Sequence, residues 1–225
     1  MIAVAVNVAA VIAGSLCGLI FKKGLPEKLS NSIMQGLALC VMYIGISGSL
    51  KCENTLGVIL SMVIGVIIGE LLKLDDRINN LGNKLETRFS SGSNSTFAKG
   101  FVSATLLFCV GAMSIVGSLE SGISGRHDTI FSKSLIDGIS AIIFTSTFGV
   151  GVMFSAVGVL VYQGTITLLA QFIAPFLTDY VINQMTAVGS LIIIGLSLNM
   201  LGLTKIKVMN MVPAIFIPII LCRFM

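Results

Sequence analysis

The chain has 225 residues, of which 55% are hydrophobic and 11% charged, and its formal net charge is +4. A soluble domain of this composition would expose far too much apolar surface, so the sequence indicates an integral membrane protein. One histidine, His127, and five scattered cysteines with no Cys-x-x-Cys pair predict neither a zinc site nor a disulfide framework. No basic run indicates nucleic-acid binding, and no cofactor is expected.

Apolar runs of membrane-spanning length recur along the chain and predict an all-α polytopic protein with eight spans. The predicted spans cover 2–21, 33–50, 55–72, 98–119, 131–148, 150–173, 181–202 and 207–223. The fifth is short, because only about 15 residues lie between Lys133 and Phe148, and they give roughly 22 Å of helix against a hydrocarbon core of about 30 Å. It is therefore expected to be tilted, broken or re-entrant.

The distribution of Lys and Arg predicts the orientation of the chain. With an external N-terminus, ten of these residues fall in cytoplasmic loops and four on the external side. Because cytoplasmic loops carry an excess of basic residues, we expect a protein of the cytoplasmic membrane with both termini external.

One substantial polar segment joins the third and fourth spans. Its apolar residues recur at helical spacing, and its charged residues fill the other faces, so we expect an amphipathic helix over 71–89. The apolar positions are Leu71, Leu74, Ile78, Leu81, Leu85 and Phe89. This helix either lies along the cytoplasmic membrane surface or binds a partner protein. The following stretch, SSGSNST at 90–96, is typical of a flexible linker.

Two parts of the chain look like copies of one three-helix unit. The run IAGSLCG at 12–18 is similar to IVGSLESG at 115–122, NSIMQGLA at 31–38 to KSLIDGIS at 133–140, and VIGVIIGE at 63–70 to AVGVLVYQ at 156–163. An odd number of spans in each copy gives the second copy the opposite orientation, as in many secondary transporters. The alternative is a shared use of Gly, Ser and Leu in membrane helices.

The repeat divides a single membrane domain, 1–225, into four parts. Residues 1–72 form the first copy, 73–97 the amphipathic helix and linker, 98–173 the second copy, and 174–225 a C-terminal helix pair. The expected architecture is two inverted repeats followed by two further helices.

Several segments resemble one protein family closely. They include LLFCVGAMSIVGSLESGISG, KSLIDGISAIIF, STFGVGVMFSA, VLVYQGTITLLA and TAVGSLIIIGLSLN, with PEKLSNSIMQGLAL and VIIGELL in the first half. Over nearly its whole length the chain resembles the uncharacterised prokaryotic membrane proteins typified by YqgA. The resemblance implies a small multi-pass protein of the bacterial inner membrane with no established substrate. Ala112 stands where many relatives have Pro, and Glu120 where many have Gln.

Polar side chains at membrane depth are the candidate site residues, because a central charge costs about 3 kcal/mol or more. Asp137 lies within the fifth span and is aligned with Gln35 of the first copy. Across an inverted pair, both would face a central path. The alternative for Asp137 is an interfacial ion pair with Lys133, four residues earlier on the same helical face.

The stretch GAMSIVGSLESG at 111–122 holds three further candidates, Gly117, Ser118 and Glu120. Its small residues at 111, 114, 118 and 121 form one helical stripe that allows another helix to approach closely. We expect the helix to end or unwind between Gly117 and Gly122, where exposed backbone and the carboxylate would coordinate a cation or carry a proton. A position at the external interface is the alternative for Glu120.

Amide side chains inside predicted spans complete the candidate path, or else hydrogen-bond neighbouring helices to one another. They are Asn7, Gln163 and Asn199.

The chain carries no nucleotide-binding loop, nucleophile elbow or His-Glu-x-x-His motif, so no enzymatic activity is expected. The predicted function is a transporter or channel for a small solute or ion, embedded in the lipid bilayer as a homodimer. The alternative is a membrane scaffold or regulator that binds a partner through the 71–89 helix. A membrane-embedded enzyme is the least favoured interpretation.

Overall fold

A computed structural model describes residues 1–22, 27–80, 96–110 and 112–221. Within these ranges the chain forms helices and turns and contains no strand, so the all-α expectation is confirmed. The helices belong to two compact units, each described by itself. The first holds α1 and α5 to α9, and the second holds most of α2 together with α3 and the helices after residue 173.

The first unit carries the candidate site. Its helices are α1 (Ile2–Lys22), α5 (Thr96–Cys109), α6 (Ala112–Ile123), α7 (Asp128–Phe148), α8 (Gly151–Leu168) and α9 (Ala170–Ile173). A hairpin at Gly149, whose φ of 81° suits glycine, reverses the chain between α7 and α8. These two helices therefore run antiparallel.

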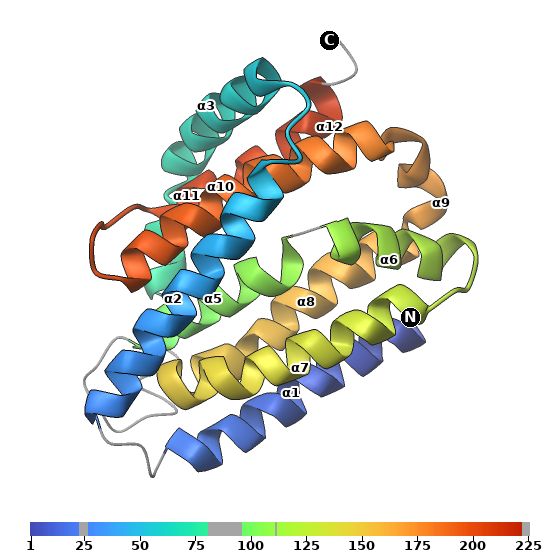
Figure 1. The fold of residues 1–225 in the computed structure, drawn as a ribbon. Helices are drawn as coiled ribbons and strands as arrows, with labels where there is room; N and C mark the ends of the chain where they lie inside the picture. Colours follow the sequence, from blue (N-terminus) through green and yellow to red (C-terminus); the bar gives the residue numbers. More distant parts are fainter. Residues whose placement is uncertain (23–26, 81–95, 111, 222–225) are drawn as a thin grey trace. The chain divides into compact units, whose positions relative to one another are not determined.

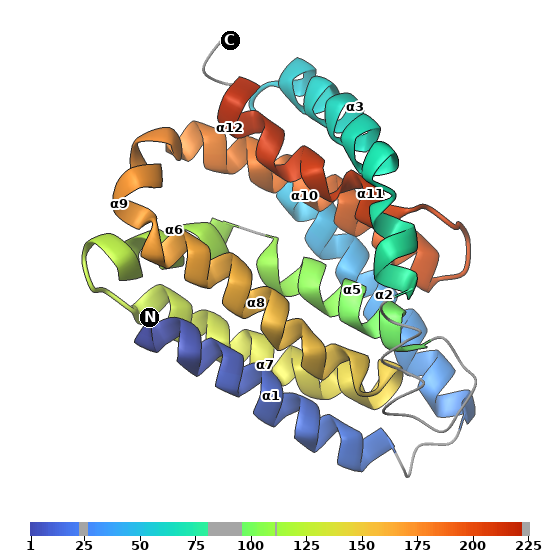
Figure 2. The same cartoon turned by 180° about the vertical axis from the view of Figure 1, so that it is seen from behind.

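Helices α1 and α7 pack closely and run in the same direction (Figures 1 and 2). A Cβ atom at Gly14 would overlap the carbonyl oxygen of Gly138, and one at Gly18 would overlap that of Ile142. The absence of side chains at these two glycines lets the helix backbones meet. Residue numbers rise together along the contact, which shows that the pair is parallel.

Helices α5 and α6 form one broken helix that follows α8. The two parts are bent by 60° at the break between them. On both sides of the break, residues of α5 and α6 approach residues of α8 in the same order along the chain. The pairs are Phe97 with Gly151, Thr105 with Gly158, Ser114 with Gln163, and Gly122 with Thr167. Because both parts run along α8 in one direction, α5 and α6 continue each other and do not form a hairpin.

The second unit contains the remaining helices. They are α2 (Glu27–Ser49, in this unit from Met34), α3 (Thr55–Leu72), η1 (Ala174–Phe176), α10 (Asp179–Met200), α11 (Val208–Met211), η2 (Val212–Phe216) and α12 (Ile217–Leu221). Gly65 and Gly69 of α3 lie against the backbone of Ala214 and Asn210. The side chain of Asn54 caps α3 by accepting from the Gly57 backbone N–H at 3.0 Å.

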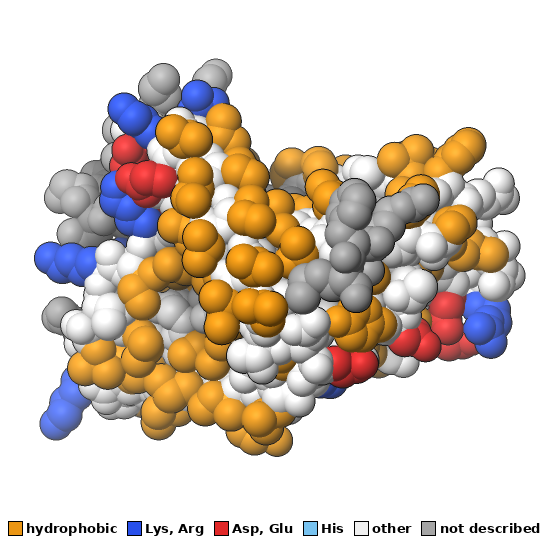
Figure 3. Space-filling view, turned by 90° about the horizontal axis from the view of Figure 1, so that it is seen from above, with side chains coloured by type: hydrophobic (Ala, Val, Ile, Leu, Met, Phe, Trp, Pro, Cys, Tyr) orange, Lys and Arg blue, Asp and Glu red, His pale blue; other side chains and the backbone are white. Residues whose placement is uncertain are grey.

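Five helices are long and apolar enough to cross a membrane, and the broken helix α5–α6 would be a sixth. The five segments are Ile2–Phe21, Asn31–Ser49, Thr55–Leu72, Gly151–Leu168 and Asp179–Met200. Large apolar side chains on these helices are exposed, such as Ile20 and Ile67. Figure 3 shows hydrophobic side chains over much of one face, with charged side chains toward its margins. These features indicate a membrane protein.

The helices at the predicted fifth and eighth spans differ in length and continuity from the prediction. Helix α7 has 21 residues, about 31 Å of unbroken helix, because it begins at Asp128 and not near Lys133. The helix is therefore continuous and not broken, but it is not among the helices that are long and apolar enough to cross a membrane, and its place in the membrane stays a prediction. The eighth is a shorter apolar stretch, Val208–Leu221, built from α11, η2 and α12.

Only the beginning of the predicted amphipathic segment belongs to the described residues. Helix α3 ends at Leu72, before Lys73 with its positive φ of 50°, and a new helix covers 74–80. Leu74 and Ile78 are half-buried there, while Asp76 and Arg77 are exposed. The rest of the predicted helix and the linker at 90–96 lie almost entirely outside the described residues.

Candidate functional site

A buried ion pair on α7 forms the centre of the candidate site. Lys133 Nζ lies 2.7 Å from Asp137 Oδ1 and 2.6 Å from Oδ2. The two residues are only 7% and 4% exposed. The ion pair expected from the spacing of the two residues is therefore formed, and it is buried inside the protein. Removing either charge from such a pair would leave the other uncompensated in a medium of low dielectric constant.

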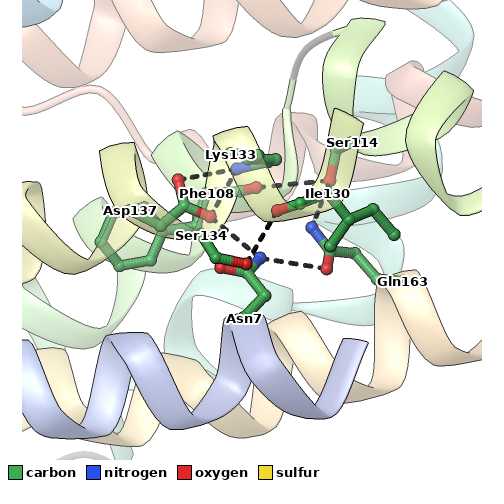
Figure 4. Close-up of polar contacts among 8 residues, drawn as sticks. All are labelled: Asn7, Phe108, Ser114, Ile130, Lys133, Ser134, Asp137 and Gln163. Atoms are coloured by element: carbon green, nitrogen blue, oxygen red, sulfur yellow. Dashed lines mark hydrogen bonds and ion pairs between the residues drawn. The ribbon is translucent and has the colours of Figure 1, made fainter. Parts of the chain in front are cut away.

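Two amide side chains connect this pair to other helices (Figure 4). Asn7 of α1 donates through Nδ2 to Asp137 Oδ2 and to Gln163 Oε1, each at 3.1 Å. Gln163 of α8 in turn donates through Nε2 to Ser114 Oγ of α6 at 2.9 Å. Asn7, Gln163 and Ser114 are fully buried. The polar network Asn7–Ser114–Lys133–Asp137–Gln163 thus joins four elements of the first unit.

The orientation of the Asn7 amide is set by its neighbours. Its nitrogen faces two oxygen acceptors, and the flipped amide would place an oxygen against the carboxylate of Asp137. Its own oxygen, Oδ1, is buried and has no hydrogen-bond partner among the described residues. An amide oxygen of this kind can accept a hydrogen bond from a water or a ligand, or coordinate a cation.

The network lies at the break between α5 and α6. Ser114 Oγ donates to the carbonyl oxygen of Phe108 at 3.4 Å, across the break. Phe108 is the last residue but one of α5, so its carbonyl lies among those that an α-helix leaves without an intrahelical partner. The carbonyl end of α5 and the N–H end of α6 are therefore both connected to the network through Ser114.

Buried hydroxyl groups continue the polar region on both sides of the network. Ser118 and Thr167 lie one turn beyond Ser114 and Gln163, roughly 6 Å along α6 and α8. Helices α1 and α7 run in the opposite direction to α6 and α8, and on them hydroxyls lie eight residues beyond Asn7 and Asp137, roughly 12 Å toward the other end of the bundle. These are Ser15 and Thr145.

All four hydroxyls are buried, and none has a partner in the described parts of the chain. We call these four hydroxyls together with the network the polar column. It extends over roughly 18 Å of a hydrocarbon core about 30 Å thick.

Comparison with known proteins identifies the family. The family described as a protein of unknown function, DUF554, matches residues 2–223. The chain belongs to this family. It is 33% identical to the uncharacterized membrane protein YdfK of Bacillus subtilis (strain 168) over 216 residues. The aligned residues are 94% of this chain and 91% of that protein.

A second relative confirms the resemblance found in the sequence. The uncharacterized protein YqgA of Escherichia coli (strain K12) is 28% identical over 216 residues, 94% of this chain and 92% of that protein. No solved structure matches the chain. The name of YdfK, a membrane protein, agrees with the apolar helices of this member of the family.

The structure brings some predicted site residues together. Asp137 and Gln163 both accept from the amide of Asn7, and Ser118 lies one turn after Ser114 on α6. Gly117 has a different role, because a Cβ there would come within 2.9 Å of Ile130 on α7. It allows α6 and α7 to pack closely.

The prediction that the helix ends or unwinds between Gly117 and Gly122 is wrong about unwinding, although the helix does end directly after them, at Ile123. Helix α6 is continuous to Ile123, and the break lies before the helix and not near its end. A backbone contact explains Gly122, since a Cβ there would overlap the carbonyl oxygen of Thr167. Glu120 accepts from Thr129 Oγ1 at 2.6 Å and pairs with Arg126 at 3.4 Å, at the turn into α7.

Two predicted residues, Gln35 and Asn199, lie in the second unit. Gln35 of α2 is exposed, and its pairing with Asp137 stays a prediction. The Asn199 side chain instead holds the loop after α10. Its Nδ2 donates to the Ile206 carbonyl at 2.7 Å, and its Oδ1 accepts from Thr204 Oγ1 and Ile206 N–H at 2.7 and 2.8 Å.

Ser114 was expected to serve helix packing, and its hydrogen bonds in the site were missed by sequence reasoning. It belongs to the stripe of small residues at 111, 114, 118 and 121, for which packing was the expected role. Ser114, Ser118 and Ser121 are indeed buried, but the hydroxyl of Ser114 also joins the network. Spacing alone cannot distinguish a packed hydroxyl from a bonded one.

The chemical character of the site follows from its atoms. It has one carboxylate, one ammonium, two amides and hydroxyls. Among the described residues there is no cluster of three His, Cys, Asp or Glu side chains suited to a metal ion. The arrangement suits the binding or passage of a small polar species and lacks the ligand set of a zinc or iron centre.

Proposed function

We propose that this chain is a transporter or channel for a small solute or ion in the cytoplasmic membrane. One observation carries the proposal. A buried ion pair and two amides meet at the break of a helix, and buried hydroxyls without partners continue from them in both directions. In secondary transporters, binding sites lie where broken helices expose polar groups near the midplane.

The amides also join helices to one another, but an ion pair is not needed for packing. Apolar residues of similar volume often stabilise a protein as well as a buried ion pair does. Charged residues inside a membrane helix are costly and occur mainly where they serve a pathway. The unpartnered Asn7 Oδ1 and the four hydroxyls each lack a polar partner, and a passing solute, ion or water would supply one.

The direction of the helices supports the proposed topology of eight spans. Because α1 and α7 are parallel, an odd number of membrane crossings separates them. One crossing each by α2, α3 and the broken helix α5–α6 gives the required three. With the predicted excess of Lys and Arg inside, both termini lie on the external side.

The proposal includes two inverted copies, 1–72 and 98–173. Helices of similar length support it, since α3 and α8 have 18 residues each and α2 and α7 have 23 and 21. The compact units do not follow the copies, because α1 of the first copy packs against α7 and α8 of the second. We further propose a homodimer without enzymatic activity, since eight short spans form a small transport unit.

Flux measurements on purified protein in liposomes test this function. We expect uptake of at least one member of a panel of ions and small metabolites, and loss of that uptake in Asp137→Asn. The matched control is Asp76→Asn, which changes an exposed carboxylate 3.9 Å from Lys207 in the second unit. Equal flux in both variants would contradict the assigned site. Absence of flux for every compound would favour the alternative, a scaffold or regulator acting through 71–89.

A further inference from the structure

We propose that Asp137 and the amide oxygen of Asn7 bind a monovalent metal cation such as Na⁺ or K⁺, in exchange with the ammonium of Lys133. This inference rests on the proposed function, because it names the class of ion that the network takes. In this structure the Lys133 ammonium binds the Asp137 carboxylate, with contacts of 2.7 and 2.6 Å to Oδ1 and Oδ2. Lys133 is thus a tethered competitor for the cation.

The charges of the network require exchange and not simple addition. Asp137 and Lys133 neutralise each other, and Asn7, Gln163 and Ser114 carry no charge. A second cation next to the pair would leave one uncompensated positive charge in a buried position, which is unfavourable at low dielectric constant. Binding of a metal cation therefore requires the ammonium to leave Asp137.

The atoms around Asp137 favour a cation over an anion. Hard metal cations prefer oxygen ligands such as carboxylates, amide oxygens, hydroxyls and backbone carbonyls. Asn7 Oδ1 belongs to the amide that contacts Asp137, and no described residue donates to it. Gln163 Oε1 and Ser114 Oγ lie within the same network. An anion would meet the carboxylate and the unpartnered amide oxygen, which both repel it.

The position of Lys133 near the exposed beginning of α7 allows its ammonium to leave Asp137. Lys133 lies five residues, roughly 7.5 Å along the axis, after the exposed residue Asp128 that begins α7. Side chains on a helix tilt toward its N-terminal end, and a lysine can carry its charge along its flexible carbon chain to the aqueous boundary. Release of Asp137 therefore moves the Lys133 ammonium toward the exposed end of α7.

Thermal unfolding of the purified full-length protein in detergent tests the exchange. The salts are NaCl, KCl and choline chloride at equal ionic strength. In Lys133→Ala the competitor is gone, so Na⁺ or K⁺ should raise the melting temperature by roughly 5 °C or more relative to choline. The additional change Asn7→Leu should reduce this shift, and Lys133→Ala/Asp137→Asn should abolish it. Lys207→Ala, which removes an exposed lysine near Glu70, is the matched control.

Equal melting temperatures of Lys133→Ala in all three salts would overturn the proposal. If Lys133→Ala does not fold in choline, it should be recovered when Na⁺ or K⁺ is present throughout purification. Equilibrium binding of ²²Na⁺ or ⁸⁶Rb⁺ to the wild-type protein gives a second readout that should be lost in Asp137→Asn. Failure of both recovery and binding would also overturn the proposal.

Parallel flux assays separate this inference from the proposed function. Cation stabilisation without any flux would support the cation site and contradict the transport function. Flux of a neutral or anionic solute, with no effect of Na⁺ or K⁺ on Lys133→Ala or on binding, would support transport and overturn the cation site.

Discussion

Breaking the ion pair of α7 should destabilise the protein far more than removing it entirely. Lys133 and Asp137 are 7% and 4% exposed and lie 2.6 Å apart at their nearest atoms. Loss of one partner leaves the other charge buried and uncompensated, which costs about 3–5 kcal/mol. Replacement of both by apolar residues of similar volume is neutral or stabilising by about 1–4 kcal/mol in comparable cases. Asp137→Leu should therefore be less stable than Lys133→Met/Asp137→Leu.

Thermal unfolding in detergent containing choline as the only added cation measures this difference. For a chain of this size, about 1 kcal/mol corresponds to roughly 2–4 °C, so Asp137→Leu should melt about 6–20 °C below the wild type. The double variant should recover most of that loss. If Asp137→Leu costs less than about 1 kcal/mol, the pair behaves as an exposed one. The reasoning that treats the network as buried would then be refuted.

Three further predictions concern packing, the loop after α10 and access to the site. Gly14→Leu should lower the stability of the protein in detergent unfolding by about 1–3 kcal/mol or more, because the new side chain meets the Gly138 backbone in the α1–α7 contact. The control Gly36→Ala has open space around it and should be neutral or slightly stabilising in the same assay. Asn199→Ala should lower stability by about 1–3 kcal/mol in detergent unfolding, since the Ile206 N–H and carbonyl lose their partner. In a variant that keeps only Cys109, the buried last residue of α5, a small hydrophilic thiol reagent should label the protein in membranes, more slowly than it labels exposed Cys40 in the corresponding variant. Complete protection of Cys109 would contradict access of water to the polar column.

Local properties explain why much of the fold can be predicted from sequence. Apolar runs such as 2–21 and 55–72 became helices with almost the predicted bounds, because length and composition decide whether a segment can form a membrane helix. The contact between Lys133 and Asp137 is also local, since residues four apart share a helical face. Its burial is not local, and it depends on the helices packed around α7.

The break in the fourth span shows where such reasoning fails. Gly117 and Gly122 suggested unwinding, yet both lie in continuous helix, because a glycine also serves where two helices approach closely. The composition of 111–122 permits either role. Contacts of α6 with α7 and α8 determine which of them applies.

By itself the sequence determined that this protein is helical, that its helices are apolar enough for a membrane, and that Asp137 has a basic neighbour one turn away. Each of these properties depends on residues close together in the chain. Only the tertiary structure decided that Asn7 joins Asp137, 130 residues away, to Gln163, 156 residues away, beside the broken helix. The parallel packing of α1 on α7 and the course of α5–α6 along α8 bring those side chains together. No spacing within a single segment specifies which helices become neighbours.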